Sequence, residues 1–132
     1  MKFPYKKIKT EYFGDILTPT FWLHVQVKTK IVPLIFLLDT GADITSLPVS
    51  AAKSLGIDLA SCQQESMEGY EGTSVLVYRS TIAIFLNNKR HIIPCVFTPI
   101  ETVPILLGRA GILNKFTITL DGKKKEIQFK EV

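Results

Sequence analysis

The sequence predicts an all-β fold in a single domain, with one or two short helices. Apolar residues mostly recur with a period of two, which is typical of half-buried strands. The turn signals "NNKR" (87–90) and "DGKK" (121–124) each separate a pair of such segments. The chain has 132 residues, of which 46% are hydrophobic, and no linker divides it. We therefore expect residues 1–132 to form one domain around one core.

The expected strands follow one another along the chain. They are residues 21–29, 31–38, 80–86, 91–97, 116–120 and 125–129. The first alternates apolar and polar side chains, whereas residues 31–38 are continuously apolar, which predicts a strand buried on both faces. The last four are expected to form hairpins, with Asp121-Gly122 as a strong turn signal. Pro33 and Pro94 lack a backbone donor, so we expect them at edges or bulges.

Helical signals are few. Residues 48–56 ("PVSAAKSLG") have Pro48 or Ser50 near a helix start and Gly56 as a stop, which predicts one or two turns of helix. Residues 110–116 ("AGILNKF") could form a second short helix. The chain is therefore mainly β, with many pairings between distant segments.

Composition argues against several classes of function. The net charge of +4 comes largely from lysines near the two ends, which alternate with strand-like residues and predict a solvated face rather than nucleic-acid binding. No apolar stretch is long enough for a membrane span, and the start lacks the apolar region of a signal peptide, which favours the cytoplasm. Cys62 and Cys95 predict two reduced thiols, so no disulfide, metal or cofactor is expected.

A carboxylate stands at the end of an apolar strand in "FLLDTGADITSLP" (36–48). Asp39 there would be costly to bury unless it is hydrogen-bonded or shares a proton. Gly41 allows a sharp turn and exposes backbone to a ligand, and Thr40 offers a hydroxyl to anchor the loop. The alternative is a plain turn in which Asp39 bonds its own backbone. Asp-Thr-Gly alone is a weak motif.

Further segments accompany this motif. "EGYEGTSV" (68–75) predicts a glycine-bracketed hairpin tip between strands. "PILLGRAGIL" (104–113) repeats the first design, with an apolar strand that leads into Gly108 and Arg109. Taken alone, Gly108 could be a tight turn and Arg109 a surface cation.

Together these segments resemble the retropepsins, which are the retroviral-type aspartic proteases and their cellular and bacterial relatives. The order and spacing match from about Thr20 to Leu120, and "LPVSAAKSLGI" (47–57) looks more like the cellular and bacterial members. The resemblance implies a closed β-barrel, with a flap hairpin over the Asp-Thr-Gly loop.

The resemblance also implies roles for individual residues. It makes Asp39 the catalytic aspartate, with Thr40 and Gly41 completing the catalytic loop. It pairs Arg109 with Asp43 in a structural ion pair. The residues that it places at the substrate are Ala42, Asp43, Gly69, Tyr70, Glu71 and Gly72.

The chemistry of this family needs two carboxylates, and the chain carries one Asp-Thr-Gly motif. The second carboxylate would come from another copy, which implies a homodimeric aspartic endopeptidase acting on extended peptides. A non-catalytic peptide-binding or dimerisation module, or a domain cut from a polyprotein, are the alternatives. Residues 121–132 predict a hairpin in place of the interleaved end strands of viral members. Residues 1–15 are expected to be an N-terminal extension or a pro-segment.

Overall fold

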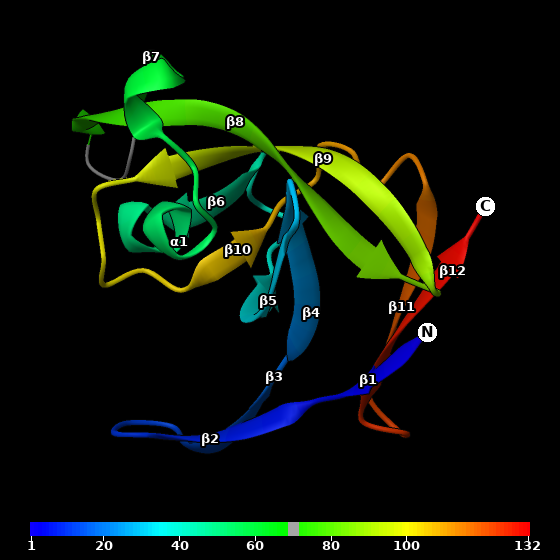
Figure 1. Cartoon of the computed structure of the whole chain (residues 1–132). Helices are drawn as coiled ribbons and strands as arrows, with labels where there is room; N and C mark the ends of the chain where they lie inside the picture. The colour runs from blue at the N-terminus through cyan, green and yellow to red at the C-terminus, as the bar shows by residue number, and fades with distance from the viewer. Residues whose placement is uncertain (69–71) are drawn as a thin grey trace.

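The structure, a computed structural model, describes residues 1–68 and 72–132. It is built mainly of strands (Figure 1). The strands are β1 (Lys2–Pro4), β2 (Lys6–Thr10), β3 (Gly14–Thr18), β4 (Thr20–Val27), β5 (Lys30–Leu38), β6 (Thr45–Pro48), β7 (Gln63–Glu68), β8 (Ser74–Leu86), β9 (Lys89–Thr98), β10 (Ile105–Leu107), β11 (Phe116–Asp121) and β12 (Glu126–Glu131). The helical segments are α1 (Val49–Ser54) and the 3₁₀ turn η1 (Leu59–Ser61).

The main sheet has the strand order β4-β5-β10-β6-β9-β8-β7, and β4 also pairs with β8. This extra pairing, at Val25↔Ile84 and Gln26↔Ala83, curls the sheet into a barrel-like ring. Most pairs are antiparallel, but β10 runs parallel to β5 and β6 runs parallel to β9. The parallel pairing of β10 with β5 places side by side the two strands that precede the Asp-Thr-Gly motif and the Gly108-Arg109 motif.

The strands expected from the sequence are confirmed, and so are both hairpins. β8 and β9 meet through Asn87 and Asn88, both with positive φ, as a two-residue turn of this type requires. β11 and β12 are joined by a longer loop, in which the Asp121 carboxylate accepts hydrogen bonds from the backbone N–H groups of Lys123 and Lys124. Side-chain bonding by Asp121 therefore shapes this turn.

The prediction that residues 31–38 are buried on both faces is wrong for most of β5. Ile31 and Ile35 are 53% and 36% exposed, and only the end of the strand, at Phe36 and Leu38, is buried. Ile35 lies opposite Trp22 of β4, which is 60% exposed. The outer face of β4 and β5 is therefore apolar but accessible in the single chain.

The prolines occupy the positions expected of them. Within β5, only Phe36–Leu38 pairs with β10. Among the described strands, Pro33 therefore has a paired neighbour on one side only, which is β4. Pro94 lies just before Cys95, where the pairing of β9 with β6 begins. Neither proline interrupts a ladder on both sides.

The helix expected at 48–56 is confirmed as α1, and Gly56 follows it with a φ of +73°. The second helix expected at 110–116 is not formed. Gly111 has a φ of +78°, which no right-handed helix contains, so the segment folds into turns. A 3₁₀ turn forms instead at η1, where the Asp58 side chain accepts a hydrogen bond from the Ala60 N–H.

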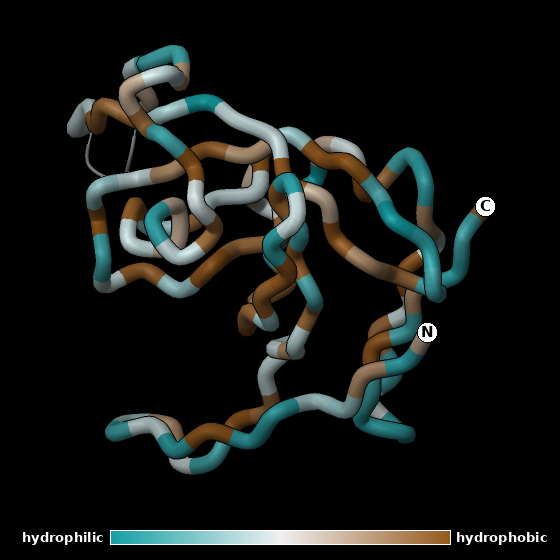
Figure 2. The backbone as a smooth tube through the Cα atoms, viewed as in Figure 1, coloured by the Kyte–Doolittle hydropathy of each residue, from teal (hydrophilic) through white to brown (hydrophobic). Residues whose placement is uncertain are grey.

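The second sheet, of order β1-β12-β11, packs against the ring through aromatic side chains. Phe3 stacks on Phe21 with ring centroids 4.6 Å apart, and both contact Phe129 edge-on. All three are buried in the core. The first strand of the chain is therefore part of the core, whereas β2 and β3 form a hairpin that extends away from it (Figure 1). Figure 2 shows hydrophobic stretches along this hairpin as well as in the core.

Candidate active site

Backbone hydrogen bonds fix the position of Asp39 and of the residue before it. The Asp39 N–H donates to the Leu107 carbonyl at the end of β10, at 3.0 Å. On the other side, the Leu38 N–H donates to the carbonyl of Pro19 at 2.9 Å. Because β5 and β10 are paired up to Leu38 and Leu107, the position of the Asp39 backbone is set by the main sheet.

The loop itself turns on the aspartate. The Gly41 N–H donates to Asp39 Oδ1 at 2.9 Å, and the Ala42 N–H donates to the Asp39 carbonyl at 3.2 Å. A Cβ atom at Gly41 would lie 3.2 Å from Asp39 Oδ1, which is a tight contact. The self-bonded turn that the sequence offered as an alternative is therefore present, and it orients a carboxylate that is only partly buried.

Gly108 brings the second motif against the first. A Cβ atom there would lie 2.6 Å from the Ile44 carbonyl oxygen, 2.8 Å from the Thr45 nitrogen and closer still to the Ile44 carbonyl carbon. The Gly108 N–H donates to Thr45 Oγ1 at 3.0 Å, and Thr45 is fully buried. Gly108 is thus required for the close approach of two backbones rather than for a tight turn alone.

Thr45 is a buried polar residue at this contact that the sequence motifs did not indicate. It lies six residues after Asp39, at the start of β6, where its hydroxyl accepts the Gly108 N–H. In β6 the buried positions are Thr45 and Leu47, so a polar residue that alternates with a core leucine is the signal that could have found it, because buried hydroxyls are almost always hydrogen-bonded.

Arg109 connects the second motif to the Asp39 loop. Its Nη1 donates to the Thr40 carbonyl at 3.0 Å, and its Nη2 contacts Asp43 Oδ1. The backbone adds hydrogen bonds from the Arg109 N–H to the Ala42 carbonyl at 3.0 Å and from the Ala110 N–H to the Asp43 carbonyl at 2.9 Å. The side chains of Asp43 and Arg109 are 83% and 43% exposed, so this pair is solvated in the single chain.

The expected flap corresponds to the hairpin of β7 and β8, in which Gln63–Glu68 pairs with Ser74–Arg79. Gly72 lies between these strands with a φ of +70° and space around its Cβ position. The other expected tip residues, Gly69, Tyr70 and Glu71, lie outside the described residues.

The described residues also bear on metal binding, membrane insertion and thiol chemistry. Among the residues that the structure describes, no three His, Cys, Asp or Glu side chains are placed to hold a metal ion. Within the same residues, no helix is long and apolar enough to cross a membrane. Burial, and to a lesser degree Cys62, raises the pKa of the Cys95 thiol to about 12, so Cys95 is a poor nucleophile.

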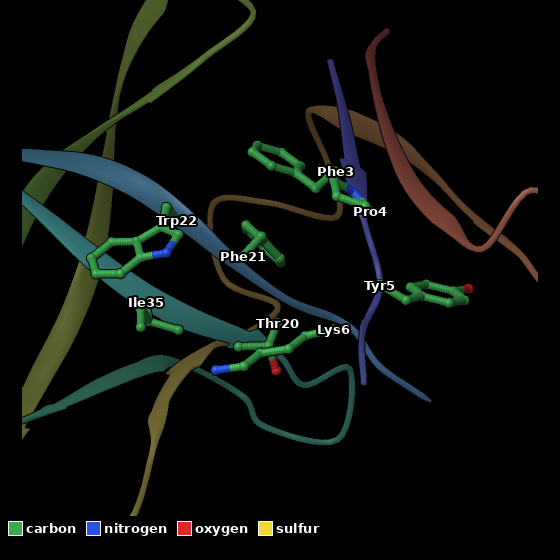
Figure 3. Close-up of a pocket in the computed structure, with 8 residues that line it drawn as sticks. All are labelled: Phe3, Pro4, Tyr5, Lys6, Thr20, Phe21, Trp22 and Ile35. Carbon is green, nitrogen blue, oxygen red and sulfur yellow. The ribbon is translucent and has the colours of Figure 1, made fainter. Parts of the chain in front are cut away.

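A cavity of about 470 Å³ lies beside the root of the β2–β3 hairpin rather than over the Asp39 loop (Figure 3). Its lining residues are Phe3, Pro4, Tyr5, Lys6, Thr20, Phe21, Trp22 and Ile35. It is separate from the hydrogen-bonded loop around Asp39.

Comparisons with known proteins agree with this geometry. A family model described as aspartyl protease matches residues 25–110, which include both motifs. A search of curated protein sequences found no significant match.

Two solved structures share the fold. A retropepsin-like aspartic protease from Rickettsia conorii is 21% identical, with a TM-score of 0.62 over 93% of this chain and 96% of that one. The EIAV protease complexed with the inhibitor HBY-793 is 20% identical, with a TM-score of 0.55 over 77% of this chain and 88% of that one. The bacterial structure matches more of the chain than the viral one, as the sequence predicted.

The family match covers well over half of the chain, and these structural matches are to retropepsins. The chain therefore belongs to the aspartyl protease family, as a member with the retropepsin fold.

Proposed function

We propose that this protein is an aspartic endopeptidase that hydrolyses peptide bonds in extended polypeptides, with Asp39 as its catalytic residue. The observation that carries the proposal is the construction of the Asp39 loop. One carboxylate oxygen is oriented by the Gly41 N–H, and the backbone is fixed by β10 and by the Arg109 side chain. A partly exposed carboxylate that is positioned by this many hydrogen bonds favours a catalytic role for Asp39 over a purely structural role in a turn.

The reaction follows from the carboxylate pair. In the proposed mechanism, one ionised aspartate takes a proton from a water molecule, and that water attacks the scissile carbonyl carbon. The second aspartate, which is protonated, donates a hydrogen bond to the carbonyl oxygen. Two adjacent carboxylates share one proton because like charges at close range cannot both ionise.

The second carboxylate would come from a second copy of the chain. The other aspartates are Asp15, Asp43, Asp58 and Asp121, and none is followed by Ser/Thr-Gly. A two-fold axis that passes between two Asp39 loops would supply the pair. Thr40 is exposed in the single chain and stands beside Asp39, so its hydroxyl is available to the partner loop.

Substrate would lie between the Asp39 loop and the β7–β8 hairpin. In this proposal Asp43 and Ala42 contact the substrate beside the loop, and Gly69, Tyr70, Glu71 and Gly72 close over it as the flap tip. The resemblance to retropepsins supports these roles. We expect cleavage between apolar residues in unfolded or extended segments.

The test is cleavage of a peptide library by wild type and by Asp39→Asn, with and without pepstatin. Asp58→Asn is the matched control, because it also exchanges a carboxylate for an amide, at the cap of η1 far along the chain. We expect Asp39→Asn to fold normally but to lose cleavage, and Asp58→Asn to remain active. If neither wild type nor Asp39→Asn cleaves any peptide, the chain is a non-catalytic module, and if both cleave equally, Asp39 is not the catalytic residue.

A further inference from the structure

The β2–β3 hairpin stands apart from the rest of the chain. In the described structure its strands pair only with one another, and no residue from Lys6 to Thr18 is buried. Figure 1 shows it projecting from the body below the end of β5. An isolated hairpin has marginal stability in water, and it usually needs a further surface to pack against.

The hairpin has two different faces. Ile8 pairs with Ile16, which places both isoleucines on one face. Lys9 pairs with Asp15 on the opposite face, and Lys7 makes an ion pair with Asp15 at 3.7 Å. One face therefore carries the two isoleucines, flanked by Lys6, Thr10 and Thr18, and the other carries Lys7, Lys9 and Asp15 together with Leu17. This division is what a strand pair with one packed and one solvated face requires.

The isoleucine face borders an apolar groove. Ile8 lines a cavity of about 250 Å³ together with Ile35, Leu37 and Pro104. Lys6, Thr20 and Ile35 also line the neighbouring cavity of about 470 Å³, so the two hollows adjoin (Figure 3). We call these two hollows together the hairpin groove. Leu37 lies two residues before Asp39, so the hairpin groove reaches the edge of the catalytic loop.

The position of the hairpin root indicates what covers this groove. The Pro19 carbonyl, directly after β3, accepts the Leu38 N–H at 2.9 Å, next to Asp39. A second copy that brings its own Asp39 to the dyad must therefore approach the hairpin root. The paired part of the hairpin is five residues long, or about 17 Å at a strand's rise per residue, which is enough to reach past a nearby two-fold axis.

The terminal strands are less suited to this contact. β1 and β12 are already paired within the chain, and Phe3 and Phe129 are buried in its own core. At the far end of the hairpin, Tyr12 and Phe13 are 82% and 80% exposed. Exposed aromatic side chains of this kind commonly anchor protein contacts.

We propose that the β2–β3 hairpin is a dimerisation arm that packs its Ile8–Ile16 face and its Tyr12–Phe13 tip on a second copy of the chain. This inference rests on the proposed function, because the two-fold Asp39 pair is what calls for the second copy. The arm of one copy would cover the hairpin groove of the other and hold the two catalytic loops together.

The test compares Ile16→Lys with Leu17→Lys by sedimentation velocity over a dilution series. These neighbours are 39% and 43% exposed, but they point to opposite faces, so the variants differ mainly in which face gains the charge. We expect Ile16→Lys to raise the dimer dissociation constant at least about tenfold and Leu17→Lys to change it little. Equal effects of the two variants on the dissociation constant would overturn the proposal that the hairpin is a dimerisation arm.

A double variant, Tyr12→Ser with Phe13→Ser, keeps the test valid if Ile16→Lys disturbs the hairpin itself. It should weaken the dimer without lowering the melting temperature of the monomer, since neither side chain is packed in the chain. A dimer with wild-type affinity in all three variants would reject the arm but leave the Asp39 pair intact. A wild type that cleaves peptides as a monomer would reject both proposals.

Discussion

Replacing Gly108 by alanine tests whether the close contact of β10 with β6 positions the Asp39 loop. The added methyl group would meet backbone atoms, 2.6 Å from the Ile44 oxygen and 2.8 Å from the Thr45 nitrogen. Backbone cannot swing aside as a flexible side chain does, so the two segments must separate. Overpacking in a core costs about 1–3 kcal/mol, and a rigid backbone neighbour places this site at the upper end.

That cost is measurable by thermal unfolding. For a domain of this size, 1 kcal/mol corresponds to about 4 °C in melting temperature, so Gly108→Ala should melt below wild type by an amount near the upper end of about 4–12 °C. Because the Leu107 carbonyl accepts the Asp39 N–H, a shift of β10 also displaces the Asp39 loop. Peptide cleavage should therefore fall even at temperatures at which the variant is folded.

Gly122→Ala is the control for this experiment, because a Cβ atom at Gly122 meets nothing within 4 Å and no positive φ is needed there. It should match wild type in both melting temperature and cleavage. If Gly108→Ala also matches wild type in both, the two backbones are not held in close contact, and the reasoning about this glycine is wrong.

Three further predictions concern the surroundings of the loop and the C-terminal hairpin. Thr45→Val removes the buried acceptor of the Gly108 N–H and should cost about 1–3 kcal/mol in urea unfolding, whereas a valine at the exposed Thr117 should not. Arg109→Ala should cost less than about 1 kcal/mol of stability, because the pair with Asp43 is solvated, yet should reduce cleavage more strongly because Thr40 loses its anchor. Hydrogen bonds from the Lys124 and Lys123 N–H groups lower the pKa of Asp121 below 3.8, so the stability lost in Asp121→Asn should be full at neutral pH and should vanish as acid protonates the wild-type carboxyl.

The sequence was sufficient for the parts of the fold that depend on local pattern. Alternation located β4, β8, β9, β11 and β12, and a continuous apolar run located β5, whereas the strands between Lys2 and Thr18 were not expected. "NNKR" located the β8–β9 turn because paired asparagines tolerate positive φ. The pairing of Asp43 with Arg109 was expected only through family resemblance, since 66 residues separate them in the chain. Spacing alone gives no reason for the contact.

Other features depend on the three-dimensional arrangement and could not be predicted. Apolar content suggested burial of Ile31 and Ile35, but side chains on the outer face of a sheet are buried only if something covers that face. No helix forms at 110–116 because Gly111 has a positive φ. Glycine permits this conformation, but the presence of a glycine in the sequence does not predict it. β1 is too short to show a period, so the core position of Phe3 was not foreseen.

The most direct test of the central claim is a mixing experiment between wild type and Asp39→Asn. The two chains are mixed in varied ratios at constant total concentration, equilibrated to exchange subunits, and assayed on one peptide. If each active site takes Asp39 from two copies, only dimers of two wild-type chains cleave, and activity falls as the square of the wild-type fraction. A linear fall would show that each chain acts alone and would contradict the shared site.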